Sequence, residues 1–247
     1  MFGEPPRTQA DLNFPLFGIP VRVHPLFWLI AVMLGPLNGG APEVLTWIVA
    51  VFFSILVHEL GHALVIRAYG LHPWIVLYGM GGLTIHDPSY ASRSRGSGPL
   101  GQILISIAGP AAGFLLVAVL LLGFVLAGHR DWIVLVGPGG LIPAVLLSNL
   151  RLTTLFFDIS FICIFWGLIN LLPIYPLDGG KIAREILLLL SPRDGIRQSL
   201  WLSILAAAAM GVIGVTQWHD WFVALFFGYL AYSNYVTLQV YSGRDPW

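Results

Sequence analysis

The chain has 247 residues, of which 57% are hydrophobic and 10% are charged, and its mean hydropathy is +0.83. Soluble domains carry roughly 25% charged residues, so 12 basic and 12 acidic side chains cannot cover a water-facing surface of this size, which excludes a soluble enzyme. The net charge of zero also excludes the basic surface of a nucleic-acid-binding module. Cys163 is the single cysteine, so histidine and carboxylate side chains must hold any metal.

Apolar runs suited to a bilayer follow a tail of 17 residues, which we expect to be extended or amphipathic. A membrane-spanning helix needs about 20 apolar residues. Six runs approach this length, at residues 19–37, 44–69, 100–127, 152–172, 200–218 and 221–238. The first run is weak because His24 and Pro25 interrupt it. We therefore expect an all-α polytopic membrane protein with about six transmembrane helices.

Two segments between these runs have other patterns. Residues 74–78 are rich in β-branched and aromatic side chains, residues 79–82 can turn, and residues 83–85 can return. This pattern predicts a small membrane-associated β-hairpin or curled strand between the second and third helices. Glycines and prolines break the apolar stretch at 132–147, which we expect to be an interfacial or re-entrant segment.

Basic residues near the ends of the spans indicate orientation, because cytoplasmic loops carry an excess of Lys and Arg. With six spans and a cytoplasmic N-terminus, 10 of the 12 basic residues fall on the cytoplasmic side. They are Arg7, Arg22, Arg67, Arg93, Arg95, Lys181, Arg184, Arg193, Arg197 and Arg244. Only Arg130 and Arg151 fall outside. We expect a multi-pass protein of a prokaryotic cytoplasmic membrane with both termini in the cytoplasm.

The second apolar run contains the sequence His58-Glu59-Leu60-Gly61-His62. Positions four apart on a helix differ in direction by roughly 40°, so the two histidines project from one face and can hold one metal ion. Glu59 is one step round the helix, where its carboxylate can act on a water molecule. A charged acid at the centre of a membrane helix costs about 2.5 kcal/mol or more, which disfavours a purely structural role for the cluster.

A catalytic zinc site typically has three protein ligands, so we expect a third ligand elsewhere in the chain. The acidic candidates within or beside the spans are Asp158, Asp178 and Glu185. Asp178 is favoured because Pro173 and Pro176 break the helix before it and free the chain to turn inward. Asp158 lies near the outer end of the fourth run. We expect Asp158 to be structural, and it stays the alternative ligand.

Four motifs, in this order, resemble those of the site-2 protease family of intramembrane zinc metalloproteases. They are the segment from His58 to His62, the turn from Gly79 to Gly82, the Ala108-Gly109-Pro110 triplet, and N-x-x-P-x-x-P-L-D-G-G from Asn170 to Gly180. The resemblance covers residues 44–180. It implies a single metalloprotease domain over residues 1–247, with 181–247 forming C-terminal transmembrane helices. The chain resembles a minimal form of the family, without a PDZ-like or C-terminal regulatory domain.

The resemblance implies a metal centre with one zinc ion per chain and with Glu59 as the general base. The implied ligands are His58, His62 and Asp178. Together with the hydrophobic spans, this centre predicts an intramembrane zinc endopeptidase that hydrolyses peptide bonds within or near transmembrane segments of membrane-tethered proteins.

The resemblance also implies contacts to the substrate. Asn170 would contact the substrate backbone or the developing oxyanion, and a strand would pair with an extended substrate segment. The strand residues are Ile75, Val76, Leu77 and Tyr78. One position departs from the family, in which Asn often stands three residues after the Gly-Pro pair, whereas this chain has Gly113.

The expected partners are a transmembrane protein substrate and the lipid bilayer, and nucleic acid is not expected. Two other functions stay open. A catalytically silent adaptor that binds membrane segments is disfavoured by the intact Glu59. A membrane zinc-binding or transport protein would need several His and acidic sites along a path, and the sequence offers one compact site. The identity of the substrate and the oligomeric state are not indicated by the sequence.

Overall fold

The computed structural model describes residues 4–87, 96, 98–137 and 140–243. The chain groups into two compact units. The sheet unit consists of Phe2–Ser94 and Ala108–Leu168, and the C-terminal unit consists of Arg95–Ile107 and Ile169–Trp247. The expected single domain over residues 1–247 stays a prediction.

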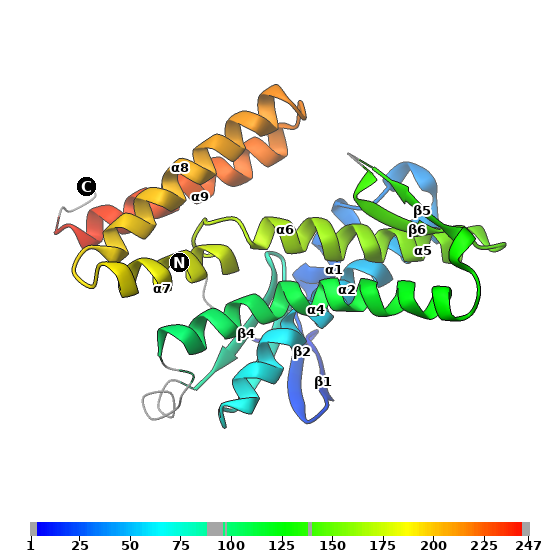
Figure 1. Ribbon diagram of the computed structural model, residues 1–247, viewed down its shortest axis with the longest axis horizontal. Helices are drawn as coiled ribbons and strands as arrows, with labels where there is room; N and C mark the ends of the chain where they lie inside the picture. The colour runs from blue at the N-terminus through cyan, green and yellow to red at the C-terminus, as the bar shows by residue number, and fades with distance from the viewer. Residues whose placement is uncertain (1–3, 88–95, 97, 138–139, 244–247) are drawn as a thin grey trace. The chain divides into compact units, whose positions relative to one another are not determined.

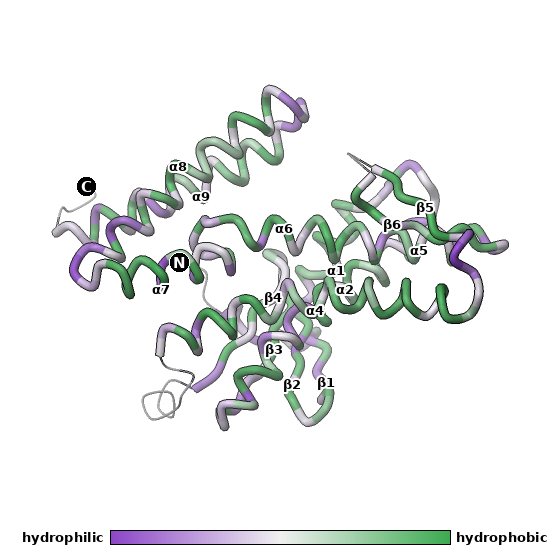
Figure 2. Tube along the Cα trace, in the orientation of Figure 1, coloured by the Kyte–Doolittle hydropathy of each residue, from purple (hydrophilic) through white to green (hydrophobic). Residues whose placement is uncertain are grey.

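Five helices in the described part of the chain are long and apolar enough to cross a membrane. They are α2 (Ala41–Ala68), α4 (Pro99–Leu126), the helical segment Leu150–Asn170, α8 (Gly195–Thr216) and α9 (Trp221–Tyr241). Apolar residues run along α4, α8 and α9 in Figure 2. Large apolar side chains such as Leu115, Leu205 and Leu225 are exposed on these helices, as contact with lipid allows. These are the features of an integral membrane protein.

The segment Leu150–Asn170 is not a uniform helix. It consists of α5 (Leu150–Phe161), a π-helical turn η5 (Ile162–Trp166) and α6 (Gly167–Asn170). Asn149 begins it as an N-cap, because its side-chain oxygen accepts hydrogen bonds from the backbone N–H of Arg151 and Leu152.

The apolar run at 19–37 does not form a spanning helix. Residues Ile19–Val23 are strand β2, and Pro25–Met33 are helix α1, which His24 caps by accepting a hydrogen bond from the Leu26 N–H at 3.1 Å. The nine residues of α1 rise about 14 Å, roughly half the hydrocarbon core of a bilayer. A 3₁₀ turn, η1 (Leu37–Gly39), follows α1. The expectation of six spans is therefore not confirmed.

The orientation predicted from basic residues depended on an even number of crossings. With α1 this short, the cytoplasmic location of both termini stays a prediction. Arg93, Arg95 and Arg244, which entered that prediction, lie outside the described residues.

A four-stranded sheet organises the sheet unit, in the order β1 (Leu12–Leu16), β2, β3 (Pro73–Tyr78) and β4 (Gly81–His86). Strands β1 and β2 pair antiparallel, as do β3 and β4, whereas β2 and β3 pair in parallel. The expected hairpin is thus half of a larger sheet, completed by residues from the expected tail and first span. A parallel pair needs a long crossover connection, and α1 with α2 supplies it.

The core of the sheet unit lies between this sheet and helices α1 and α2. Val21, Val23, Ile75 and Leu77 from the two central strands pack with Ile55 of α2, among other buried residues. This packing fixes the sheet against α2, so that residues of β4 reach the middle of that helix.

Arg22 on β2 ties the N-terminal tail to the sheet. Its buried guanidinium donates to the carboxylates of Glu4 and Asp11 at 2.9 Å each, and to the carbonyl oxygen of Pro5 at 2.8 Å. A buried Arg is stable only when such partners satisfy its donors. These contacts hold residues 4–11 of the tail against β2.

A short 3₁₀ turn, η3 (Arg130–Trp132), leads into the stretch at 132–147, which contains two strands. Strands β5 (Ile133–Val136) and β6 (Ile142–Val145) pair antiparallel, so their facing backbone groups bind one another. Strand β6 packs against α5, beside which Figure 1 shows the hairpin.

The C-terminal unit contains α7 (Asp178–Leu190) and the helix pair α8–α9. Helices α8 and α9 lie side by side along their length (Figure 1), and α7 packs against α8. A non-helical turn, residues 171–177, joins α6 to α7. This turn is called the Asp178 turn here because it ends where Asp178 begins α7.

Candidate metal centre

Helix α2 brings the two histidines of the sequence motif together. The Nε2 atoms of His58 and His62 are 3.2 Å apart, the rings are inclined at 79°, and both side chains are buried. Two nitrogens that each lie about 2.05 Å from a tetrahedral zinc ion are about 3.3 Å apart. The separation of the two ring nitrogens therefore fits two ligands of one zinc ion.

Helix α4 approaches α2 closely at the histidines. A Cβ atom added to Gly61 would collide with the backbone of Ala108, and a Cβ added to Gly109 would collide with the His62 ring and lie 2.7 Å from His58 Nε2. Gly109 therefore places no side-chain atom in the space beside the two ring nitrogens. A metal ion needs such a space on the side to which its ligand atoms point.

Glu59 is held by the edge strand of the sheet. The hydroxyl of Thr84 on β4 lies 2.7 Å from Glu59 Oε2, to which it donates, and 3.0 Å from the Glu59 backbone oxygen. Gly82, two residues earlier on the same face of β4, leaves room for the Glu59 carboxylate, because a Cβ there would overlap it. The buried carboxylate is thus fixed in one position beside the histidines.

Thr84 and Gly82 were not among the residues predicted from the sequence. The signal that could have found them is the alternation in Gly82-Leu83-Thr84-Ile85, which places Gly82 and Thr84 on one face of a strand. Tyr78 belongs to the same surroundings. Burial, and secondarily the negative charge of Glu59, raise the pKa of the Tyr78 hydroxyl above its usual value of 10.0.

Asp178 and Asn170 belong to the C-terminal unit. Asp178 is the first residue of α7 and is 3% exposed, and Lys181 Nζ donates to its Oδ1 at 3.0 Å. Asn170 is the last residue of α6 and is also buried. The sheet unit brings His58, His62 and Glu59 together, whereas the meeting of Asp178 and Asn170 with them stays a prediction.

The expected strand addition to Ile75–Tyr78 needs a correction. These residues lie in β3, and β3 is an interior strand with β2 on one edge and β4 on the other. The backbone groups of Ile75, Val76 and Leu77 face pairing partners on both sides, so a substrate strand cannot add to them. The edge strand on this side of the sheet is β4.

The other candidates of the sequence analysis lie in less suitable surroundings. Asp158 is buried in α5. Among the described residues, its carboxylate is not part of the set of nearby ligand atoms that contains His58 and His62. Gly113 of α4 faces Cys163, with ordinary van der Waals room for a Cβ atom.

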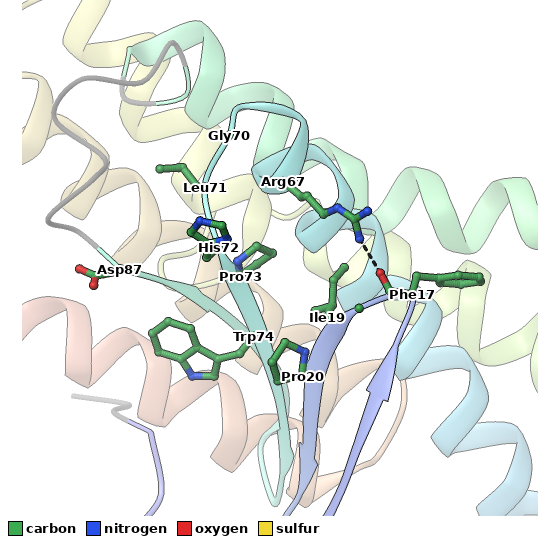
Figure 3. Close-up of a pocket in the computed structure, with 11 residues that line it drawn as sticks. Phe17, Ile19, Pro20, Arg67, Gly70, Leu71, His72, Pro73, Trp74 and Asp87 are labelled. Carbon is green, nitrogen blue, oxygen red and sulfur yellow. Dashed lines mark hydrogen bonds between the residues drawn. The ribbon is translucent and has the colours of Figure 1, made fainter.

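A cavity of about 670 Å³ lies elsewhere in the sheet unit (Figure 3). Its lining includes Phe17, Arg67, His72, Trp74 and Asp87, and Arg67 Nη1 donates to the backbone oxygen of Phe17. None of the predicted catalytic, metal or substrate residues lines this cavity. It is therefore separate from the candidate metal centre.

Comparisons with known proteins indicate the family to which the chain belongs. The model of peptidase family M50 matches residues 46–213. A Synechocystis protein whose name describes a zinc metalloprotease is 31% identical over 225 residues, which cover 81% of this chain and 52% of that protein. A zinc metalloprotease of Methanocaldococcus jannaschii is 28% identical over 178 residues, covering 70% of this chain and 44% of that protein. The chain spans about half the length of these curated relatives.

A solved structure supports the fold. The site-2 protease from Methanocaldococcus jannaschii matches with a TM-score of 0.58 at 22% identity, and the match covers 93% of this chain and 95% of that chain. Because the family model matches well over half of its residues, this chain belongs to peptidase family M50, the family of the site-2 proteases.

Proposed function

We propose that this chain is an intramembrane zinc endopeptidase that cleaves transmembrane segments of membrane-tethered proteins. The observation that carries the proposal is the convergence of His58 and His62 beside the fixed carboxylate of Glu59, all buried in a helix long enough to span a membrane. Such groups are costly inside a bilayer and indicate a functional site. Relatives named as zinc metalloproteases support the chemistry.

The donor set fits zinc. His58 and His62 would supply two imidazole nitrogens, and Asp178 would supply one carboxylate oxygen, which together form a three-ligand catalytic set with one ion per chain. All three side chains are buried. When bound, zinc supplies Lewis acidity, which lowers the pKa of a coordinated water to about 7 and polarises a carbonyl group.

Glu59 would act as the general base and then as the general acid. Its carboxylate would take a proton from the attacking water and deliver it to the amine that leaves when the peptide bond breaks. Thr84 donates to Oε2, so it holds the carboxylate in one rotamer during both transfers. Asn170 would supply an amide to the substrate backbone or the oxyanion.

The substrate would lie as an extended strand along β4. A strand that adds to this edge would run beside Gly82 and Thr84, the two residues that touch Glu59. A transmembrane helix must unwind locally to adopt that form. Segments with helix-breaking residues near the cut should therefore be better substrates than uniform leucine helices.

The type of membrane and the orientation of the protein in it are also part of the proposal. We propose a prokaryotic cytoplasmic membrane, in keeping with the named relatives, with 10 of the 12 basic residues and both termini on the cytoplasmic side, an arrangement that requires an even number of crossings. The lipid bilayer and one transmembrane protein substrate are the proposed partners.

The test compares Glu59→Gln with wild type in detergent-purified full-length protein. A panel of tagged single-span segments, with and without a central Gly-Pro pair, serves as substrate. We expect cleavage of the Gly-Pro segments to fall by about 10² to 10⁴-fold in Glu59→Gln while zinc content stays the same. Glu43→Gln is the matched control, because Glu43 is exposed in the first turn of the same helix.

The same experiment separates the other two functions. Wild type and Glu59→Gln that both capture segments without cutting them would indicate a silent adaptor. Zinc uptake into proteoliposomes that is equal in both proteins would indicate a transporter. Equal cleavage of uniform leucine segments and Gly-Pro segments would contradict the unwinding step alone.

A further inference from the structure

The Asp178 turn is a stretch of non-helical backbone between two helices of a membrane protein. Backbone groups at membrane depth must find partners within the protein. Within the turn, the N–H of Ile174 donates to the Leu172 oxygen at 2.7 Å, and the N–H of Leu177 donates to the Ile174 oxygen at 2.8 Å. Pro173 and Pro176 have no N–H to satisfy. Tyr175 lies between the two prolines, and both of its backbone groups bind side chains outside the turn.

Both backbone groups of Tyr175 are bound by side chains from the C-terminal helix pair. Its N–H donates to Ser203 Oγ of α8 at 3.0 Å, and its carbonyl oxygen accepts from Asn234 Nδ2 of α9 at 2.6 Å. Ser203 is 1% exposed and Asn234 is 2% exposed. Two buried polar side chains from two different spans therefore hold one residue of the turn.

The orientation of the Asn234 amide is determined by its contacts. Nδ2 donates to two carbonyl oxygens, those of Tyr175 and Leu230 at 2.6 and 2.8 Å, so the reversed amide would place an oxygen against both. Among the described residues, Asn234 Oδ1 is buried without a hydrogen-bond partner. A leucine at this position would avoid that unsatisfied atom. The role that explains an asparagine here is the donation to the turn.

A hydrogen bond and close backbone packing join the Asp178 turn to the start of α7. The N–H of Lys181 donates to the Leu177 oxygen, which joins the turn to the first turn of α7. A Cβ atom on Gly179 would overlap the backbone of Leu171, and one on Gly180 would overlap the backbone of Ile174. The turn and the start of α7 are packed backbone to backbone, so they move as one body.

We propose that Ser203 and Asn234 are positioning residues for the Asp178 carboxylate. They hold the Asp178 turn in the conformation in which that carboxylate is presented as a metal ligand. The C-terminal helix pair α8–α9 thereby sets the geometry of the third ligand, although it contributes no ligand itself. This inference rests on the proposed zinc-binding role of Asp178.

The test measures zinc affinity of the full-length protein in detergent, by competition with a chelator. We expect Ser203→Ala and Asn234→Leu to bind zinc about 10-fold more weakly or worse, as is typical when groups that orient metal ligands are removed. Ser203→Thr keeps the hydroxyl and should restore near wild-type affinity. The melting temperature without zinc is measured for every variant beside the affinity.

Two matched controls come from the same helices. Ser199 of α8 is buried, and its hydroxyl donates within its own helix, to the Ile196 oxygen. Thr237 of α9 likewise donates to the Ser233 oxygen. Ser199→Ala and Thr237→Val should therefore leave zinc affinity unchanged.

The outcomes are distinct. Zinc affinities of Ser203→Ala and Asn234→Leu equal to those of Ser199→Ala and Thr237→Val would overturn the proposal, even if the melting temperatures fell. Because Asn234→Leu can fail to fold, the Ser203→Ala and Ser203→Thr pair decides the matter by itself. If Asp178→Asn retains full zinc affinity, the ligand assignment in the proposed function has failed instead.

Discussion

Thr84→Val tests whether the edge strand of the sheet positions the catalytic carboxylate. Valine has nearly the shape of threonine but cannot donate to Glu59 Oε2, so the 2.7 Å hydrogen bond is lost. A hydrogen bond to a charged group contributes about 1.5 to 3 kcal/mol. If that energy holds the carboxylate in its reactive position, kcat should fall by roughly 10 to 150-fold, since 1.4 kcal/mol corresponds to a factor of 10.

The assay is the rate of cleavage of a Gly-Pro segment at saturating substrate, with zinc content measured in parallel. Zinc content should not change, because the Thr84 hydroxyl binds Glu59, which is not a proposed zinc ligand. Thr84→Ser should keep most of the activity. Thr46→Val is the control, since the Thr46 hydroxyl donates to the Pro42 oxygen within α2 and is remote from Glu59 in the helix. Equal kcat values for Thr84→Val and Thr46→Val would refute the reasoning.

Three further predictions concern the metal centre and the N-terminal tail. Asp178→Asn should lose most of its zinc while Asp158→Asn keeps it, as metal analysis of the purified proteins would show; the reverse pattern would make Asp158 the third ligand. Gly109→Ala should weaken zinc binding about 10-fold or more by crowding both histidines, whereas Gly123→Ala, with open space around it on the same helix, should not. Hydrogen bonds from Thr8 and Arg22 lower the pKa of Asp11 from 3.8 to about 2. The stability that the charged Asp11 contributes is thus present above pH 3.8 and is lost as the pH falls through 2. Asp11→Asn should therefore reduce the fall in melting temperature between pH 5 and pH 2. A fall equal to that of wild type would contradict this.

The part of the site that the sequence predicted depends on local spacing. His58 and His62 meet because they are four residues apart on one helix, and that separation is fixed by helix geometry alone. The long apolar runs are equally local, and the runs at 44–69, 100–127 and 221–238 correspond to α2, α4 and α9 within a few residues.

The sequence did not predict that residues 19–23 form a strand. Ile19–Val23 is apolar enough to be read as part of a span, but its partner is β3, with Val21 opposite Ile75 more than 50 residues later. Neither segment alone indicates a parallel pairing across two helices. The same pairing makes β3 an interior strand, which is why the predicted strand addition had to move to β4.

Polar side chains within apolar helices show where sequence reasoning stops. Ser199, Ser203 and Asn234 all stand out as polar residues in spans α8 and α9, and each is buried. Ser199 binds its own helix, as serine often does, while Ser203 and Asn234 bind the backbone of Tyr175. The sequence contains the same kind of signal for all three residues, because it shows a polar group in an apolar run but not the partner that the group binds. Their different contacts place Ser203 and Asn234, but not Ser199, in direct contact with the turn that carries Asp178. Helices α8 and α9 contain no ligand of the proposed site. Variants that change zinc affinity without touching a ligand should therefore be found in these two helices.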